Sequence, residues 1–254
     1  MTKKNFLLAD VGNTYTKVEV HYGVEIQQIA FNSFTDDRNF PRDQWQHIIK
    51  EYDVQDVFYS SVIPAFHSEI EQLNVSGRIM RVHSELRLPF TIAYCTPFTL
   101  GSDRICVVSA AAQRKSSASL IISAGTCITF DVLVGTTYIG GSISPGVKMR
   151  AKAMHHFTQA LPEVDVFKFN ALWKEENPLF VGKTTEECLL AGSVQGAAFE
   201  INEYINRLSQ MHENLNIYLT GGDAITLEKL IKSDIFARPN MCLEGLNILY
   251  KLNA

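Results

Sequence analysis

An acid, a glycine, hydroxyls and a lysine gather near the start of the chain in an order suited to binding a phosphate. The segment reads Asp10, Val11, Gly12, Asn13, Thr14, Tyr15, Thr16, Lys17. Unpaired backbone N–H groups of a glycine turn and the ammonium of Lys17 favour anionic oxygen. Asp10 is suited to hold Mg2+ directly or through water, because this hard cation prefers oxygen ligands. Alone, the segment fits an ordinary Gly-Asn hairpin with an exposed acid equally well.

Two later glycine turns repeat this design behind apolar runs. They read Ser123, Ala124, Gly125, Thr126 and Thr220, Gly221, Gly222, Asp223. Two phosphate-binding hairpins about half the chain apart indicate duplicated halves that close on one nucleotide. The third turn runs from a strand into a helix start, which suits the nucleoside or α-phosphate end of that nucleotide.

A fourth segment, Gly101-Ser102-Asp103-Arg104, offers groups for acting on an alcohol that also carries an acid. Phosphoryl transfer to an alcohol needs a group that accepts the hydroxyl proton, and Asp103 is our candidate. The planar guanidinium of Arg104 matches a substrate carboxylate. Without the other motifs, Asp103 would fit a helix cap and Arg104 a surface ion pair at least as well.

The elements that must position these residues alternate between strand and helix, which indicates an α/β fold. We expect strands at 5–11, 15–21, 24–31, 57–60, 79–82, 91–93, 119–124, 127–133, around 138 and before 220. We expect helices at 42–52, after 64, at 100–114, after 145, at 185–212 and in two final segments. The serine-rich stretch 115–119 marks a boundary, which predicts an N-terminal half at 1–115 and a C-terminal half at 116–254.

The composition of the chain excludes several classes of protein. The chain has 254 residues, 46% of them hydrophobic, and a formal net charge of −4 without a basic stripe, which excludes nucleic acid as a primary partner. No apolar stretch reaches the roughly 20 residues that span a bilayer, and the N-terminus lacks a secretory pattern, so we expect a cytoplasmic protein without a membrane partner. Five scattered cysteines predict buried, reduced thiols.

The order of these motifs resembles type III pantothenate kinase over nearly the whole chain. The matching segments are 10–14, 97–104, 124–126, 140–146, 182–187, 220–222 and 243–247. The resemblance implies a duplicated actin-like (ribonuclease-H-like) fold, with the nucleotide cleft between two halves. It also implies a homodimer that uses ATP to phosphorylate pantothenate to 4'-phosphopantothenate, the first step of coenzyme A biosynthesis.

The resemblance also assigns roles to single residues. Asp103 would accept the proton of the pantothenate hydroxyl, and the other contacts to pantothenate would come from Tyr94, Gly101, Ser102, Arg104 and Thr185. Residues 10–17, Thr126, Gly221 and Gly222 would bind ATP. Other interpretations stay open for Tyr94, as an aromatic on a half-buried strand, and for Thr184 or Thr185, as the N-cap of the long helix with Glu186 or Glu187 completing a capping box.

One position departs from the family pattern. The family carries an acid before the second glycine turn, as Asp-x-Gly-Thr, which is thought to bind K+ or NH4+; here Ser123 stands there. A hydroxyl attracts a cation less than a carboxylate does, so we predict a weak, altered or absent monovalent-cation site.

Two further hypotheses follow from the sequence. Because Ser123 breaks a motif, the chain could be a catalytically degenerate regulator that only binds nucleotide or pantothenate. The presence of Asp10, Asp103 and Arg104 argues against this, since a binding module has little need for a general base. Residues 164–178, rich in aromatic and polar side chains, are a candidate loop over the substrate.

Overall fold

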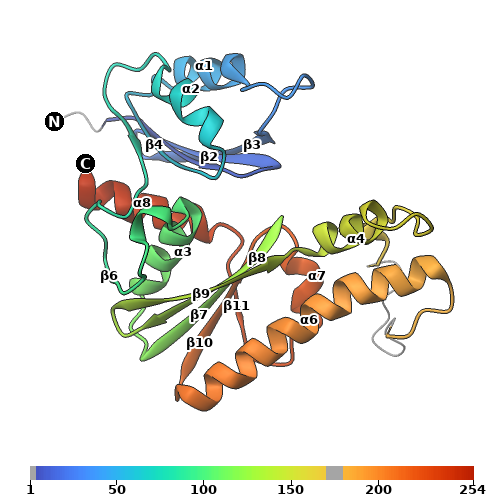
Figure 1. The fold of residues 1–254 in the computed structure, drawn as a ribbon. Helices are drawn as coiled ribbons and strands as arrows, with labels where there is room; N and C mark the ends of the chain where they lie inside the picture. The colour runs from blue at the N-terminus through green and yellow to red at the C-terminus, as the bar shows by residue number, and fades with distance from the viewer. Residues whose placement is uncertain (1–3, 170–179) are drawn as a thin grey trace. The chain divides into compact units, whose positions relative to one another are not determined.

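The computed structural model describes residues 4–169 and 180–254 and has an α/β architecture (Figure 1). Contacts divide the chain into two compact units. Unit 1 comprises Met1–Arg114, Thr136–Tyr138 and Asn240–Ala254, and unit 2 comprises Lys115–Gly135 and Ile139–Pro239. The chain therefore returns to unit 1 after completing unit 2. The halves predicted from the sequence, 1–115 and 116–254, describe the two copies of the duplicated fold. These contact units do not test that division, which stays a prediction.

Unit 1 is built on a five-stranded sheet in the order β3-β2-β1-β4-β5. The strands are β1 (Phe6–Val11), β2 (Tyr15–Tyr22), β3 (Glu25–Asn32), β4 (Asp56–Ser61) and β5 (Ile79–Arg81). The first three form an antiparallel meander, whereas β4 pairs in parallel with β1 and β5. This register sets Asp10 of β1 between Lys17 of β2 and Ser60 of β4.

The remaining elements of unit 1 are mostly short helices. They are α1 (Arg42–Glu51), η1 (Pro64–Phe66), α2 (His67–Glu71), β6 (Thr91–Ile92), η2 (Pro97–Thr99), α3 (Ser102–Ala112) and α8 (Met241–Asn253). Helix α1 buries Trp45, Ile48 and Ile49, whose spacing of three and four residues puts them on one face. This face packs into a core with Leu7 and Val18. Each large side chain buried there stabilises the fold by about 1.5–3 kcal/mol.

Unit 2 contains most of a six-stranded sheet in the order β11-β10-β7-β8-β9-β6. Its strands are β7 (Ala118–Ala124), β8 (Cys127–Val134), β9 (Thr137–Pro145), β10 (Leu215–Thr220) and β11 (Phe236–Ala237); Thr137 and Tyr138 of β9, which pair with β6, belong to unit 1. Its helices are α4 (Val147–His156), η3 (Val166–Lys168), α6 (Thr185–Met211) and α7 (Ala224–Glu228). The buried stripe of α6, including Leu190, Val194 and Ile201, packs with Phe130 and Leu219 of the sheet in one core.

The strand and helix predictions are confirmed to within a few residues, and β11 was missed because two exposed residues carry no periodic signal. The expectation of reduced thiols is confirmed for all five cysteines, but Cys95 and Cys188 are exposed, so the expectation that all are buried is wrong. Of the candidate loop 164–178, Val166 and Phe169 pack in the core of unit 2. Positions 170–178 lie outside the described residues.

Asp56 at the start of β4 ties three parts of unit 1 together. Its buried carboxylate accepts hydrogen bonds from the backbone N–H of Arg78 (2.8 Å), the Tyr250 hydroxyl (3.0 Å) and the Lys4 ammonium (3.3 Å). Burial by itself raises the Asp56 pKa, but these donors outweigh it, and the net pKa lies below the ordinary value. The carboxylate therefore stabilises the fold in its ionised form.

We expect Asp56→Asn to destabilise the protein by about 2–3 kcal/mol, because an amide leaves buried donors unpaired. The depressed pKa means that the wild type keeps this stabilisation above the unfolded-state pKa and loses it as pH falls through the folded-state pKa. Urea unfolding of both proteins at pH 7 and in acid measures this. The difference between them should shrink in acid, whereas Lys4→Ala, which removes only an exposed partner, should cost less than about 1 kcal/mol.

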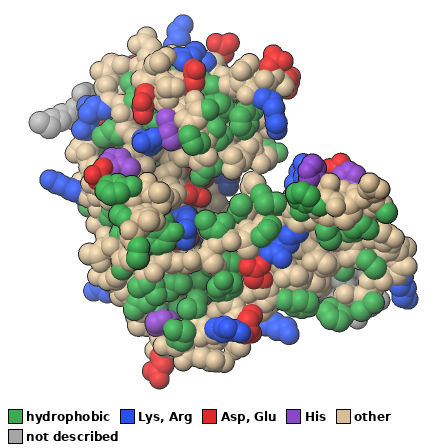
Figure 2. Space-filling view, viewed as in Figure 1, with side chains coloured by type: hydrophobic (Ala, Val, Ile, Leu, Met, Phe, Trp, Pro, Cys, Tyr) green, Lys and Arg blue, Asp and Glu red, His purple; other side chains and the backbone are tan. Residues whose placement is uncertain are grey.

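Acidic and basic side chains are interspersed over the visible face of the molecule, and hydrophobic side chains form patches among them (Figure 2). Within residues 4–169 and 180–254, none of the helices has the length and apolar character needed to cross a membrane.

Candidate active site

The turn between β1 and β2 has the tight geometry that its sequence predicts. The Gly12 N–H donates to the Tyr15 carbonyl at 3.1 Å, and the hydroxyl of Ser33 donates to the Gly12 carbonyl at 2.6 Å. Asn13, Thr14 and Tyr15 are exposed at the tip. Val11 and Thr16 are buried, and the Thr16 hydroxyl bonds Ser33 at 3.0 Å. The tip is thus exposed to solvent, while Ser33, the residue after β3, holds the base of the turn by hydrogen bonds.

Asp10 lies at the end of β1 in an environment that disfavours its charge. Burial, and then the negative charge of Asp103, raise the pKa of Asp10 to about 6. A hydrogen bond from the Cys242 thiol and the positive charge of Lys17 act in the opposite direction. The two carboxylates predicted to do chemistry, more than 90 residues apart in sequence, are therefore close enough to repel each other.

Ser102 fixes the start of α3 to the end of β4. Its hydroxyl lies 2.9 Å from the Ser60 hydroxyl, accepts from the Ser61 N–H at 3.1 Å and is 3.2 Å from the Ser61 carbonyl. These contacts hold the start of α3 against the end of β4, where Ser60 pairs with Asp10 of β1. The predicted contact of Ser102 with substrate is not tested by this geometry and stays a prediction.

Asp103 occupies the first turn of α3, as the sequence predicts, and Gly101 is the N-cap. A Cβ on Gly101 would lie 2.5 Å from Oδ1 of Asp103, so the carboxylate folds back over Gly101 and would have to shift if this residue carried a side chain. Burial raises the Asp103 pKa, and this is partly offset by hydrogen bonds from the backbone N–H groups of Arg104 and Asp103 and by the charge of Arg104. The result is a half-buried carboxylate with raised proton affinity, as a general base requires.

Arg104 and Tyr94 are brought together by Tyr138. The Arg104 guanidinium carbon lies 6.0 Å from the Tyr138 ring centroid. The ring centroids of Tyr94 and Tyr138 are 6.1 Å apart. Arg104 and Tyr138 are buried, whereas Tyr94 is half-buried. The structure thus gathers Asp10, the 101–104 segment and Tyr94 within unit 1.

In unit 2, two other backbone segments close on the 124–126 turn. The Gly146 N–H donates to the Thr126 carbonyl at 3.1 Å, and a Cβ on Gly146 would lie 2.0 Å from the Gly125 carbonyl oxygen. Gly221, at φ +98°, would place a Cβ 2.1 Å from the Ala124 carbonyl oxygen. Gly221 is therefore required both for its left-handed backbone and for this close approach. Thr126 and Gly222 are exposed beside these contacts.

Ser123 sits in a row of hydroxyls across the sheet of unit 2. It pairs with Thr129 of β8 on one side and Thr220 of β10 on the other. The Thr129 hydroxyl donates to the buried Asp131 carboxylate at 3.1 Å. The position where the family pattern has an acid thus carries neutral oxygens, with a carboxylate two residues further along β8.

The structure decides which of Thr184 and Thr185 caps the long helix α6. Thr184 is the N-cap of α6, and its hydroxyl accepts from the Glu187 N–H at 3.2 Å. Glu187 accepts in return from the Lys183 N–H at 2.7 Å, a variant of the capping box. Thr185 is the first helical residue and is exposed, and its predicted contact with pantothenate stays a prediction.

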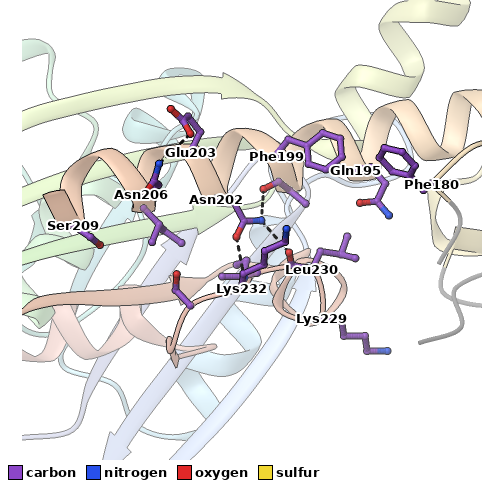
Figure 3. A pocket seen from close by; sticks show the side chains of 14 residues that line it. Phe180, Gln195, Phe199, Asn202, Glu203, Asn206, Ser209, Lys229, Leu230 and Lys232 are labelled. Atoms are coloured by element: carbon purple, nitrogen blue, oxygen red, sulfur yellow. Dashed lines mark hydrogen bonds between the residues drawn. The ribbon is translucent and has the colours of Figure 1, made fainter. Parts of the chain in front are cut away.

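A separate groove of about 900 Å3 runs beside α6 (Figure 3). Asn202 is one of its lining residues; its side-chain amide donates to the Leu230 carbonyl at 3.0 Å and accepts from the Lys232 N–H at 2.9 Å. None of the predicted site residues lines the groove, so it is not part of the candidate site.

Sequence reasoning missed residues that support the site rather than form its motifs. Ser60 is hydrogen-bonded to Ser102, Ser33 donates to the Gly12 carbonyl of the first turn, and the Cys242 thiol acts to lower the pKa of Asp10. Each acts on a motif residue distant in sequence, so no local spacing marks it. The described residues contain no group of three or more His, Cys, Asp or Glu suited to a metal ion.

Comparison with known proteins identifies similar chains. A sequence model of type III pantothenate kinases matches residues 6–207. The type III pantothenate kinase of Christiangramia forsetii is 34% identical over 253 residues, which cover 97% of this chain and 98% of the relative. Among solved structures, a Campylobacter jejuni protein described as a Baf family transcriptional activator has a TM-score of 0.63 at 20% identity, covering 96% of this chain and 97% of its own. A Sinorhizobium meliloti protein described as a 2-dehydro-3-deoxygalactonokinase has a TM-score of 0.57 at 12% identity, covering 97% and 98%. The structural likenesses show a shared fold.

Proposed function

The chain belongs to the type III pantothenate kinase family, and from this premise we propose how its residues perform the reaction. It has the duplicated actin-like fold of such kinases and is a phosphotransferase with an alcohol acceptor. It transfers the γ-phosphoryl group of ATP to pantothenate, giving 4'-phosphopantothenate, the first step of coenzyme A biosynthesis. The proposal concerns the residues and ions that carry this out.

Asp103 is the proposed general base. Its carboxylate accepts the proton of the pantothenate hydroxyl while that oxygen bonds to the γ-phosphorus and the bond to the β-phosphate oxygen breaks, releasing ADP. The observation that supports it is a half-buried carboxylate with a raised pKa that lies over the N-cap residue Gly101. Arg104 would pair with the pantothenate carboxylate, and Tyr94, Gly101, Ser102 and Thr185 would complete the substrate contacts.

The donor set of unit 1 fits Mg2+. Asp10 offers carboxylate oxygens, and a bound divalent cation would offset the repulsion from Asp103 that helps to raise the Asp10 pKa. Asp10 would hold the ion directly or through water. When bound, Mg2+ supplies positive charge to the phosphate oxygens of ATP. Asp10 to Lys17 in unit 1, and Thr126, Gly221 and Gly222 in unit 2, are the proposed nucleotide contacts.

Pantothenate-dependent release of ADP tests the reaction. With [γ-32P]ATP, label should move to pantothenate only when Mg2+ is present. Binding of nucleotide or pantothenate without turnover would instead indicate the regulator considered above.

We propose that the monovalent-cation site is weak because Ser123 and its neighbours Thr129 and Thr220 offer neutral oxygens. Replacing K+ or NH4+ by Na+ should then change kcat/KM by no more than about threefold. Ser123→Asp should introduce a clear preference for K+. Strong K+ activation of the wild type at low millimolar concentration would show that the hydroxyl oxygens suffice.

A homodimer acting in the cytoplasm is also proposed. The family resemblance implies the homodimer, and the exposed side chains of Ile139 and Ile143, both on β9, are candidates for its interface. Exposed free thiols at Cys95 and Cys188 suit a reducing compartment. Sedimentation velocity measures the oligomeric state, and a molar mass of one chain across the working concentration range would exclude the homodimer.

A further inference from the structure

The peptide unit between Pro145 and Gly146 borders the second glycine turn and is held at both ends. Its N–H, on Gly146, donates to the Thr126 carbonyl at 3.1 Å. Its carbonyl oxygen, on Pro145, accepts from Nε of Arg150 at 2.8 Å. Because a peptide unit is planar, a donor that fixes its oxygen also fixes the direction of its N–H. Arg150 therefore sets, through one peptide plane, the hydrogen bond that holds Thr126.

Arg150 is itself held by the long helix α6. Its Nη2 forms an ion pair with the Glu200 carboxylate and lies 3.4 Å from the Ser144 hydroxyl. A Cβ on Gly196, one helical turn before Glu200, would lie 4.0 Å from Nη1 of Arg150, so the guanidinium lies against this part of α6. The Arg150 and Glu200 side chains are only 23% and 26% exposed, which shields their pair more than an ion pair on the surface.

The two helices that carry this ion pair share a core. Val147 and Ala151 of α4 are buried with Ala197 and Ile201 of α6, and the helices lie side by side (Figure 1). This apolar packing is non-directional, so it fixes the distance between the helices but not the direction of a single N–H group. A directional contact from Arg150 supplies what the packing lacks.

Resting on the function proposed above, we infer that Arg150 is a positioning residue that, held by Glu200, sets the turn of residues 124–126 for the phosphates of ATP. The planar guanidinium carries Nε and Nη2 on one rigid fork, so it bonds the Pro145 carbonyl and Glu200 at the same time. A lysine ammonium would supply the charge but not two donors fixed in one plane. Arg150 touches no phosphate in this scheme and acts through the 145–146 peptide unit.

The test compares Arg150→Lys, Glu200→Ala and the double variant by calorimetric titration with the non-hydrolysable ATP analogue AMP-PNP. Each single change should weaken binding of the analogue about 3- to 10-fold, because the Pro145 carbonyl loses its fixed donor. The double variant should bind no more weakly than the weaker single variant, since both residues act in one chain of contacts. Glu203→Ala is the matched control: it removes a glutamate of α6 from an exposed ion pair with Arg207, and affinity should stay within about twofold.

The same variants are assayed for turnover. In Arg150→Lys, KM for ATP should rise while KM for pantothenate stays constant, a split that a general loss of packing would not produce. Wild-type affinity for the analogue in Arg150→Lys would show that the positive charge suffices and would overturn the inference, as would effects of the two single changes that add in the double variant. A wild type that binds the analogue but transfers no phosphoryl group to pantothenate would refute the proposed function alone, and the binding comparison would still decide the role of Arg150. A wild type that binds no nucleotide would overturn both.

Discussion

Replacing Asp103 by asparagine is expected to lower kcat about 100- to 10,000-fold, because the amide cannot accept the hydroxyl proton. ADP binding should stay within a few-fold of the wild type, since the proposed role of Asp103 concerns the alcohol. Steady-state rates and calorimetry on the same preparations measure both quantities.

The wild type should also show a characteristic pH profile. Asp103 must be ionised to accept a proton, and burial raises its pKa, so kcat/KM should fall as pH is lowered through a pKa above the usual aspartate range. Asp43→Asn is a matched control, because Asp43 also occupies the first turn of a helix in unit 1 but is exposed. A kcat for Asp103→Asn within threefold of the Asp43→Asn value would refute the assignment.

Adding one methyl group at Gly245 is expected to destabilise the protein by at least about 3 kcal/mol, because overpacking against a backbone atom cannot be relieved by a side-chain rotation. The Cβ would lie 1.8 Å from the Cys106 carbonyl oxygen and 2.4 Å from its carbon, so α3 and α8 must separate. Separation also moves Asp103, so kcat should fall in the fraction that stays folded.

Gly192→Ala provides the control for a glycine in a helix. No described atom outside its own helix turn lies within 4 Å of a Cβ built at Gly192, which is exposed on α6. The change should stabilise the protein by about 0.5–1 kcal/mol, the difference in helix propensity. Urea unfolding that gave the two variants the same sign of change would contradict the packing of α8 on α3.

The local elements could be predicted because their signals are local. The β1–β2 hairpin, the first turn of α3 and the start of α6 each follow from a few neighbouring residue types, and each is present within a residue or two. The choice between Thr184 and Thr185 as N-cap could not be made from the sequence, because both are threonine, a good N-cap residue. Only the backbone geometry at Thr184 decides it.

The support of the site could not be predicted for a different reason. Ser60, Ser102 and Cys242 act across 42 or more residues of sequence, and their partners are chosen by strand register and helix crossing. Gly101, Gly146 and Gly221 lay within recognised motifs, but their steric roles depend on the specific oxygen atom each one faces. The motifs thus identified the candidate catalytic and binding residues, whereas the residues that hold them in position depend on packing between distant segments.

The return of α8 to unit 1 has a consequence for how the protein is made on the ribosome. Residues 240–254 are synthesised after the whole of unit 2, yet they supply Tyr250 to Asp56 and the helix that packs on α3. A nascent chain that has emerged only as far as residue 114 therefore lacks a partner for one face of its first sheet and for its proposed catalytic helix. We expect such a fragment to remain protease-sensitive until translation passes α8, because contacts distant in sequence form late.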